Sequence, residues 1–250
     1  MDPAEYEKMY DLEDYYWWFQ GRKRVVTRLL DALPKASERP KVLDLGCGTG
    51  LMLKHLDEAY DPVGLDFSEL ALHFSRRRGA GKLVRGDAQV LPFADNSFDL
   101  VTSLDLAEHV EADTLMLREV ERVLKPGGHL ILTVPAHPFL WSEHDDVLYH
   151  FRRYRRPQLQ ERVEYAGLGI ERLTYCITFT FPVIAGYRLV QKFFRKQAKP
   201  KTHLIVLPNW ANRILLGLVR FEAYIIRWID LPFGVTLIAQ ACKKGKGGKK

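Results

Sequence analysis

Acidic side chains at three points of the chain have the types and spacing to bind a polar cofactor. Asp44 precedes a turn with three alternating glycines, Asp66 lies 22 residues further on, and Asp87 belongs to a Gly-Asp-Ala run. The glycines are Gly46, Gly48 and Gly50. Glycines let a backbone turn sharply and approach a ligand closely. A carboxylate repels phosphates, so the set indicates a ligand with a cationic group and hydroxyls.

A second chemical segment covers residues 135–156, PAHPFLWSEHDDVLYHFRRYRR. Histidine is the usual proton acceptor near neutral pH, which makes His144 or His150 a candidate general base. Guanidinium groups match phosphates and carboxylates, so Arg152 and Arg153 are candidates for holding an anionic group. The alternative is that the acidic residues of the segment pair with these arginines and order a lid.

Strands alternate with helices around both segments. Helices are expected within residues 4–33 and at 51–56, 115–124 and 158–166. Strands are expected at residues 41–45, 63–66, 82–85, 98–104, 129–134 and 170–176, with LKPGG as a stop before the fifth, and at 234–243. This alternation predicts an α/β fold with a doubly wound, mainly parallel sheet. In such sheets, loops at the carboxyl ends of successive strands share one site.

The ordered motifs resemble those of the class I S-adenosylmethionine-dependent methyltransferases. VLDLGCGTG, GLDFS, GDAQVLPFADNSFDLVTS, LDLAEHV and LKPGGHLILTVP follow one another over residues 41–135. The resemblance implies a Rossmann-like seven-stranded sheet whose last strand is antiparallel, with S-adenosylmethionine as cofactor and S-adenosylhomocysteine as product. By the same resemblance, cofactor-binding residues are Arg22, Asp44, Gly46, Cys47, Gly48, Gly50, Asp66, Phe67, Asp87, Ala88, Gln89, Leu104 and Asp105.

The resemblance also divides the chain. Residues 1–40 are expected to form an N-terminal helical cap. Residues 41–176 and 233–243 would form the cofactor-binding domain. Residues 177–232 would be an apolar and basic helical insertion, serving as a lid or a membrane contact. Residues 244–250 would be a disordered Lys/Gly tail.

The absence of two motifs narrows the class of acceptor. The chain lacks the Asn/Asp-Pro-Pro-Tyr of amino-group enzymes and the Pro-Cys of cytosine C5 enzymes, and looks most like methyltransferases of small molecules and lipids, including those of quinone biosynthesis. The 135–156 segment and the N-terminal W-W-F-x-x-R also resemble a bacterial subgroup of these enzymes.

The expected bases are His109, His144 and His150, and the expected acceptor-binding residues are Trp18, His137, Trp141, Arg152, Arg153 and Tyr154. A metal site from His144, Asp145 and His150 is conceivable, but methyl transfer to an ionisable heteroatom does not require one, so no metal is expected.

Charge is distributed unevenly. Residues 1–150 carry 17 basic and 26 acidic side chains, whereas residues 151–250 carry 20 basic and 5 acidic ones. Arg213, Arg220 and Arg227 recur every seven residues in an apolar helical pattern. Further basic residues are Lys192, Arg195, Lys196, Lys199 and Lys201. This pattern suits contact with an anionic membrane surface. A lid over the acceptor, or packing in a dimer or core, is the alternative.

These observations favour an enzyme acting on a small-molecule or lipid-linked, anionic acceptor. One alternative is a membrane-surface protein whose methyltransferase fold has lost its chemistry. Another is an RNA methyltransferase, which the aliphatic residues between the basic ones and the absence of nucleic-acid motifs disfavour. Three dispersed cysteines and no apolar leader predict a cytoplasmic protein, with peripheral attachment to the inner face of the membrane as a second option.

Overall fold

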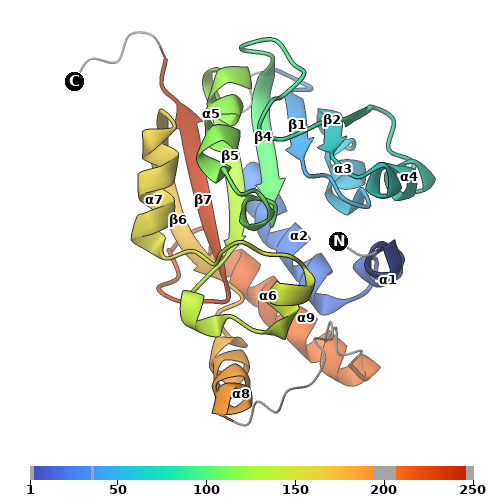
Figure 1. Cartoon of the computed structure of the whole chain (residues 1–250), viewed down its shortest axis with the longest axis vertical. Coiled ribbons are helices and arrows are strands. Elements are labelled where there is room, and N and C mark those ends of the chain that lie inside the picture. The colour runs from blue at the N-terminus through green and yellow to red at the C-terminus, as the bar shows by residue number, and fades with distance from the viewer. Residues whose placement is uncertain (1–2, 35–36, 194–206, 246–250) are drawn as a thin grey trace.

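A seven-stranded sheet forms the centre of the computed structural model, which describes residues 3–34, 37–193 and 207–245 (Figure 1). Its strands are β1 (Lys41–Leu45), β2 (Asp61–Asp66), β3 (Leu83–Arg85), β4 (Phe98–Leu104), β5 (Leu124–Pro135), β6 (Leu168–Cys176) and β7 (Thr236–Lys243). The order across the sheet is β3-β2-β1-β4-β5-β7-β6. Strands β1 to β5 run parallel, whereas β7 is antiparallel to both β5 and β6. The predicted fold class and the antiparallel last strand are confirmed.

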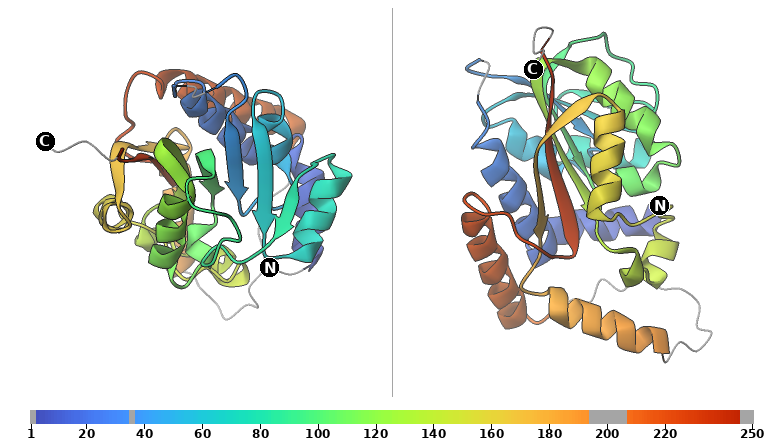
Figure 2. Two further views of the ribbon diagram at one scale, coloured as in Figure 1. Left: turned by 90° about the horizontal axis from the view of Figure 1, so that it is seen from above. Right: turned by 90° about the vertical axis from the view of Figure 1, so that its left-hand side faces the viewer.

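Helices cover both faces of this sheet (Figure 2). They are α1 (Pro3–Glu13), α2 (Trp17–Leu30), α3 (Leu51–Leu56), α4 (Glu69–Arg77), α5 (Asp113–Val123), α6 (Glu143–Val147), α7 (Arg156–Tyr165), α8 (Phe181–Phe193) and α9 (Asn209–Ile225). Helices α5 and α7 pack on one face, and α2 lies on the other with α9 outside it. Strands β1 and β4 are buried over most of their length because both of their faces are covered.

Strand β5 begins earlier than the sequence predicts. LKPGG was expected to stop the chain before residue 129, but the strand already starts at Leu124. Gly127 has a φ of +79°, which only glycine adopts readily, and the register with β4 shifts between Phe98 and Leu100. The glycines therefore form an irregularity within the strand.

Residues 177–235 leave the sheet after β6 and return to it at β7. Cys176 and Thr236, the end residues of these strands, are register partners in the antiparallel pair. Helix α9 packs against α2, where Gly21 faces Val219 so closely that a Cβ atom would lie 2.7 Å from the Val219 side chain. The buried Glu222 carboxylate accepts the backbone N–H groups of Ile177 and Thr178 and so ties α9 to the end of β6.

None of the described helices is both long and apolar enough to cross a bilayer. Two basic groups of the sequence, residues 195–201 and the lysines from residue 246 onward, lie outside the described residues. The division into cap, core and insertion stays a prediction.

Candidate functional site

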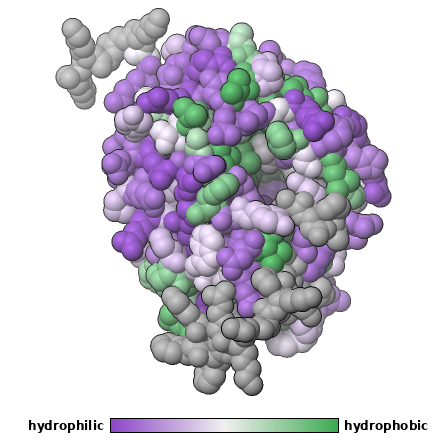
Figure 3. Space-filling view, in the orientation of Figure 1, coloured by the Kyte–Doolittle hydropathy of each residue, from purple (hydrophilic) through white to green (hydrophobic). Residues whose placement is uncertain are grey.

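One cavity of about 910 Å³ opens at the carboxyl ends of β1, β2 and β4. Its wall includes residues from α1, α2, α6 and α8, so both the N-terminal helices and the insertion contribute to it. The predicted residues that line it are Trp18, Arg22, Asp44, Gly46, Cys47, Gly48, Asp66, Phe67, Asp87, Ala88, Gln89, Leu104, Asp105, His109, His144, His150 and Arg153. In Figure 3, hydrophilic side chains predominate on the face seen in Figure 1, with apolar ones scattered among them.

Asp44, in the fourth position of β1, is almost fully buried in this wall. Its Oδ1 atom accepts the Thr102 hydroxyl at 2.8 Å, but no described residue donates to Oδ2. Burial raises the pKa of Asp44 to about 7, although the hydrogen bond from Thr102 opposes this rise. A cationic group beside Oδ2 would therefore stabilise the ionised carboxylate.

The glycine turn after β1 brings the backbone close to neighbouring segments. Gly46 has a φ of +73°, and a Cβ atom there would lie 2.9 Å from the Leu106 side chain. Gly50 has a φ of +86°, and a Cβ atom would meet the Ser75 hydroxyl at 2.7 Å. Larger residues at either position would strain the turn and push it toward the cavity. Gly50 itself supports the turn from outside the cavity lining.

Asp66, the last residue of β2, holds this turn. Its Oδ2 atom accepts the Gly48 N–H at 3.0 Å, and Oδ1 accepts the Ser68 N–H at 2.9 Å. Asp87 accepts the Gln89 N–H at 2.8 Å, while the Phe67 ring is 72% exposed at the cavity edge. Carboxylates at two neighbouring strand ends are suited to hydroxyl and amine donors of a nucleoside.

The N-terminal helices close the site through one partly buried and one buried ion pair. Arg22 of α2 pairs with Asp105 after β4, opposite the glycine turn. Glu13 of α1 accepts the Thr49 hydroxyl and pairs with Arg78 at 2.9 Å. The sequence gives no sign of the Glu13 contact, because its partners lie 36 and 65 positions away along the chain.

S-adenosylmethionine fits this donor and acceptor set. Its sulfonium and ammonium charges match the unpartnered Asp44 oxygen, and its adenosine hydroxyls match carboxylates at the ends of β2 and β3. The glycine turn leaves room for close contact. The cap supplies Arg22, which is neutralised by Asp105.

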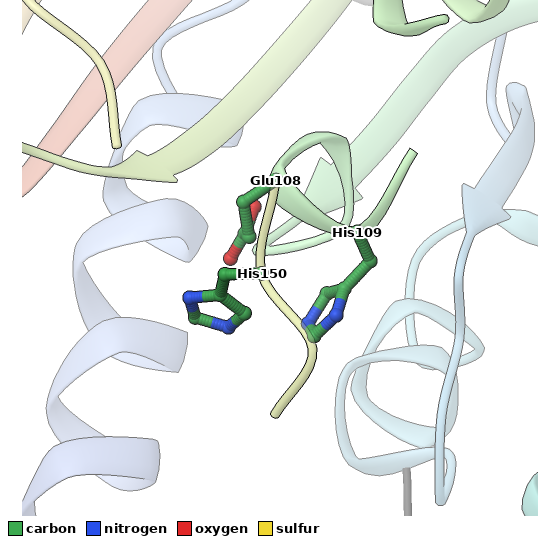
Figure 4. A group of neighbouring side chains, drawn as sticks. All are labelled: Glu108, His109 and His150. Carbon is green, nitrogen blue, oxygen red and sulfur yellow. The ribbon is translucent and has the colours of Figure 1, made fainter. Parts of the chain in front are cut away.

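On the other side of the cavity, Glu108, His109 and His150 form a compact cluster (Figure 4). Glu108 and His109 belong to the short 3-10 helix Ala107–His109 after β4, and His150 follows α6. The His109 and His150 ring centroids are 4.5 Å apart, and the ring planes are nearly perpendicular. Glu108 was not predicted to belong to the site, although it immediately precedes His109 in the EHV motif.

Two cavity histidines are neutral at pH 7. Burial lowers the pKa of His109 to about 4, and burial also lowers the pKa of His144 to about 4 despite the nearby Asp145 charge. Neutral imidazoles accept protons, but a pKa this low makes each a weak base.

Asp145 of α6 organises the cationic groups around the cluster. Its Oδ1 atom lies 3.0 Å from His150 Nδ1 and 2.7 Å from Arg153 Nε, and its Oδ2 accepts the Ser142 N–H at 2.8 Å. Burial opposes ionisation, but the hydrogen bond to His150 and the charge of Arg153 hold the pKa of Asp145 well below its ordinary value.

Arg188 of α8 brings a further guanidinium to this side of the cavity. It lines the cavity, donates to the Leu140 carbonyl at 2.5 Å and lies 3.8 Å from Asp145 Oδ2. Burial and the neighbouring Arg153 charge lower the pKa of Arg188 to about 10. Arg188 was not predicted as a site residue. The one feature of the sequence that distinguishes it is that it is the single charged residue in the apolar run FPVIAGYRLV.

Four of the predicted acceptor-binding residues lie outside the cavity lining. Tyr154 is buried in the core and donates to Asp113 at 2.7 Å, and Arg152 pairs with the same Asp113 at 2.9 Å. His137 stacks on Tyr175. Trp141 Nε1 donates to Asp146 at 2.8 Å. Each of the four therefore contacts another protein group that helps to order the segment between β5 and α7.

Comparisons with known proteins agree with this geometry. Residues 43–132 match the family described as Methyltransferase domain. Demethylmenaquinone methyltransferase of Staphylococcus aureus is 42% identical over 108 residues, which cover 40% of this chain and 45% of that protein. The chain spans less than half the length of the first curated relatives that it matches.

Solved structures extend the similarity of fold over nearly the whole chain. A protein from Haloferax volcanii, solved in complex with the Trm112 methyltransferase activator, superposes with a TM-score of 0.65 at 21% identity, covering 98% of this chain and 97% of that one. An S-adenosylmethionine-dependent methyltransferase from Thermotoga maritima gives a TM-score of 0.60 at 18% identity over 96% of each chain. Residues 43–132 therefore form a methyltransferase domain, and the seven-stranded sheet with its antiparallel β7 is the one that the resemblance to class I S-adenosylmethionine-dependent methyltransferases implies.

Proposed function

We propose that the chain transfers the methyl group of S-adenosylmethionine to an acceptor that carries an anionic group and is reached from a membrane surface. The cofactor half of this proposal rests on Asp44, Asp66 and the glycine turn. The acceptor half rests chiefly on Arg188.

Arg188 supports an anionic acceptor because its charge is incompletely neutralised. Asp145 is the carboxylate that faces both Arg188 and Arg153, and its shorter contacts go to Arg153 and His150. Two guanidinium groups thus share one carboxylate in a partly desolvated wall. A phosphate or carboxylate on the acceptor would supply the missing negative charge and bind the guanidinium in a bidentate manner.

The insertion supports a membrane location. Helix α9 buries Val219 and Ala223 against the protein, whereas large apolar side chains are exposed on its opposite face. Those on α9 are Trp210, Ile214, Leu218, Phe221 and Tyr224, followed by Trp228 and Ile229 just beyond it. Arg213, Arg220 and Arg227 are exposed directly beside Ile214, Phe221 and Trp228 in the sequence. An aromatic and aliphatic face bordered by arginines is typical of a helix lying in an anionic membrane interface.

Helix α8 both lines the cavity and exposes apolar side chains. Ile184, Tyr187 and Arg188 line the cavity, while Val183 and Val190 on the same helix are exposed. A lipid-linked acceptor held by its apolar part near α8 would therefore present its polar end to Arg188. This arrangement favours a lipid-linked acceptor over a freely diffusing one.

Methyl transfer from a sulfonium is an in-line displacement, and positioning supplies much of its rate enhancement. S-adenosylmethionine supplies the electrophilic methyl group. Asp44 would hold its cationic part, Asp66 and Asp87 its adenosine, and Arg188 would orient the acceptor. His144, His109 and His150 stay candidates for receiving the acceptor proton.

The test is transfer of labelled methyl groups from the cofactor into fractionated cell extract. We expect label in an acidic lipid fraction, with at least a tenfold loss in Arg188→Gln. Arg118→Gln, on the exposed side of α5 away from the cavity, is the matched control. Label in RNA would instead support an RNA methyltransferase, and vesicle binding without any transfer would support the lapsed-enzyme alternative.

A further inference from the structure

We propose that Glu108, His109 and His150 bind one divalent transition-metal ion, of the type represented by Zn²⁺, in the wall of the cavity. The sequence-based expectation was that no metal is needed, and its conceivable ligand set included His144 and Asp145 instead. The arrangement in the folded chain brings together a different trio. Its two segments, residues 107–109 and the stretch after α6, are far apart in sequence but adjacent in space (Figure 4).

The geometry is that of a three-ligand site. One ligand atom from each residue lies within 4.8 Å of those of the other two. Tetrahedral ligands of zinc stand about 3.4 Å apart, since each is about 2.1 Å from the ion. Side-chain rotations that shorten the separations of the ligand atoms by at most about 1.4 Å would complete the coordination. Two imidazoles and a carboxylate favour zinc and its transition-metal neighbours over magnesium or calcium, which prefer all-oxygen sites.

Partners outside the trio already orient both imidazoles. His150 Nδ1 is 3.0 Å from Asp145 Oδ1, which leaves Nε2 for an ion. The His109 ring hydrogen-bonds to the backbone of Leu148, so its second nitrogen is the one available. Metal-binding histidines characteristically donate their other ring N–H to a carboxylate or a backbone carbonyl, and both kinds of support occur here.

Glu108 supplies an independent observation. Only 1% of its surface is exposed, and its Oε2 atom has no hydrogen-bond partner among the described residues. A buried carboxylate oxygen without a partner costs free energy comparable to a lost hydrogen bond or more. An ion between Oε2 and the two imidazoles would remove this cost.

Neighbouring positive charges are compatible with a cation. Arg22 is paired with Asp105, and Arg153 is paired with Asp145 at 2.7 Å. Arg188 stands on the far side of Asp145, within 3.8 Å of that carboxylate. The charges of these guanidinium groups are therefore balanced by Asp105 and Asp145, which reduces their repulsion of a cation bound by the trio.

Three protein ligands leave a coordination position open toward the cavity. If the proposed function holds, an acceptor hydroxyl bound there would lose its proton to solvent at a lower pH than in water. Its oxygen would then form the bond to the methyl carbon as the carbon–sulfur bond breaks. This chemical role depends on the proposed function, whereas metal binding by the trio does not.

The test measures Zn²⁺ binding to the full chain by equilibrium dialysis against a competing chelator, with neither acceptor nor cofactor present. We expect one ion per wild-type chain and at least a hundredfold weaker binding for Glu108→Gln, His109→Ala and His150→Ala. Asp145→Asn should weaken binding about tenfold to a hundredfold, because it removes only the orienting partner of His150. Circular dichroism identifies any variant that fails to fold.

His144→Ala is the matched control. His144 lines the same cavity, and its ring centroid is 6.4 Å from that of His150, but it does not belong to the trio. Its substitution should leave zinc affinity unchanged. No zinc binding by the wild-type chain, or equal binding by folded His150→Ala, would overturn the proposal. A failure of methyl transfer with intact zinc binding would count against the proposed function alone.

Discussion

Asp66 at the end of β2 accepts the backbone N–H of Gly48 in the turn after β1, at 3.0 Å. The two strands are parallel neighbours, with Leu45 in register with Leu65. One carboxylate therefore fixes the shape of the glycine turn and borders the cavity at the same time. Changes at Asp66 should alter both the turn and its ligand.

Replacing Asp66 with Ala should weaken S-adenosylmethionine binding by at least tenfold. The variant loses a charged acceptor for the Gly48 and Ser68 N–H groups and, as we propose, for the ribose hydroxyls; a hydrogen bond to a charged group contributes about 1.5–3 kcal/mol. Titration calorimetry measures the dissociation constant. Asp61→Asn, at the exposed opposite end of β2, should bind as the wild type does. Equal affinities for both variants would contradict the assignment of the cofactor site.

Cofactor binding should strengthen as the pH rises from 6 to 8. Burial raises the pKa of Asp44 to about 7, so the free protein loses stability through this group as the pH rises from its unfolded-state value of 3.8 through 7. A cationic ligand favours the ionised carboxylate, and affinity should gain about tenfold per pH unit below 7 before levelling off. Calorimetry in buffers of different ionisation enthalpy should show a proton released near pH 6.

Asp44→Asn supplies the control for that pH dependence. It should bind the cofactor more weakly than the wild type, with little change in affinity between pH 6 and 8. An equally steep dependence in this variant would assign the proton to another group.

Arg188→Gln should raise KM for the acceptor by tenfold or more and leave the cofactor dissociation constant unchanged. The loss corresponds to a charge-assisted contact with an anionic group. Arg188→Lys keeps the charge but not the bidentate geometry, so its KM should lie between those of the wild type and Arg188→Gln. Steady-state kinetics with the labelled fraction as acceptor distinguishes this from a change in kcat alone, which an anion-binding role does not predict.

Phe221→Glu should reduce binding to vesicles of phosphatidylglycerol and phosphatidylcholine by about tenfold or more, because a large apolar side chain contributes about 1.5–3 kcal/mol when buried. Tyr165→Glu, an equally exposed aromatic position on α7, is the control. Flotation at rising salt should weaken the wild-type association, since the arginines act through screened charge. Unchanged flotation of Phe221→Glu would remove the membrane part of the proposed function.

Tyr154→Phe should lower the free energy of unfolding by about 1–3 kcal/mol, because Asp113 loses a buried donor. Neither KM nor cofactor affinity should change if Tyr154 is a core residue. Denaturant unfolding and kinetics on the same preparation measure the two effects. A stable variant with impaired acceptor binding would instead support the predicted role of Tyr154 in acceptor binding.

Much of the sheet is predictable because strand patterns are local. The predicted limits of β1, α3 and β4 agree with the structure residue for residue. Helix α6 was not expected, because five mainly acidic residues are too few to show a helical periodicity. In the structure, Ser142 and Asp145 form a capping box at the start of α6. Asp145 also binds His150 and Arg153.

The predicted cofactor residues converge on one cavity because their motif positions fix them to strand ends. On the acceptor side, residue type alone did not indicate which side chains line the cavity. Arg152 and Arg153 are adjacent, yet Arg152 lies outside the cavity lining and pairs with Asp113, whereas Arg153 lines the cavity and pairs with the buried Asp145. Arg188 reaches that wall from a different helix, through a contact with Leu140 that lies 48 residues away along the chain.

The pairing of Cys176 with Thr236 means that the insertion departs from the sheet and rejoins it at neighbouring points. Segments with adjacent ends are readily replaced during evolution, because the strands that flank them need not move. Under the proposed function, acceptor choice and membrane attachment would diversify by exchange of residues 177–235, while the carboxylates proposed to hold the methyl donor stay unchanged. We expect that grafting this segment from one related enzyme into another would transfer the acceptor specificity of the donor enzyme. The position of Gly21 would have to hold a residue small enough for the new helix to pack against α2.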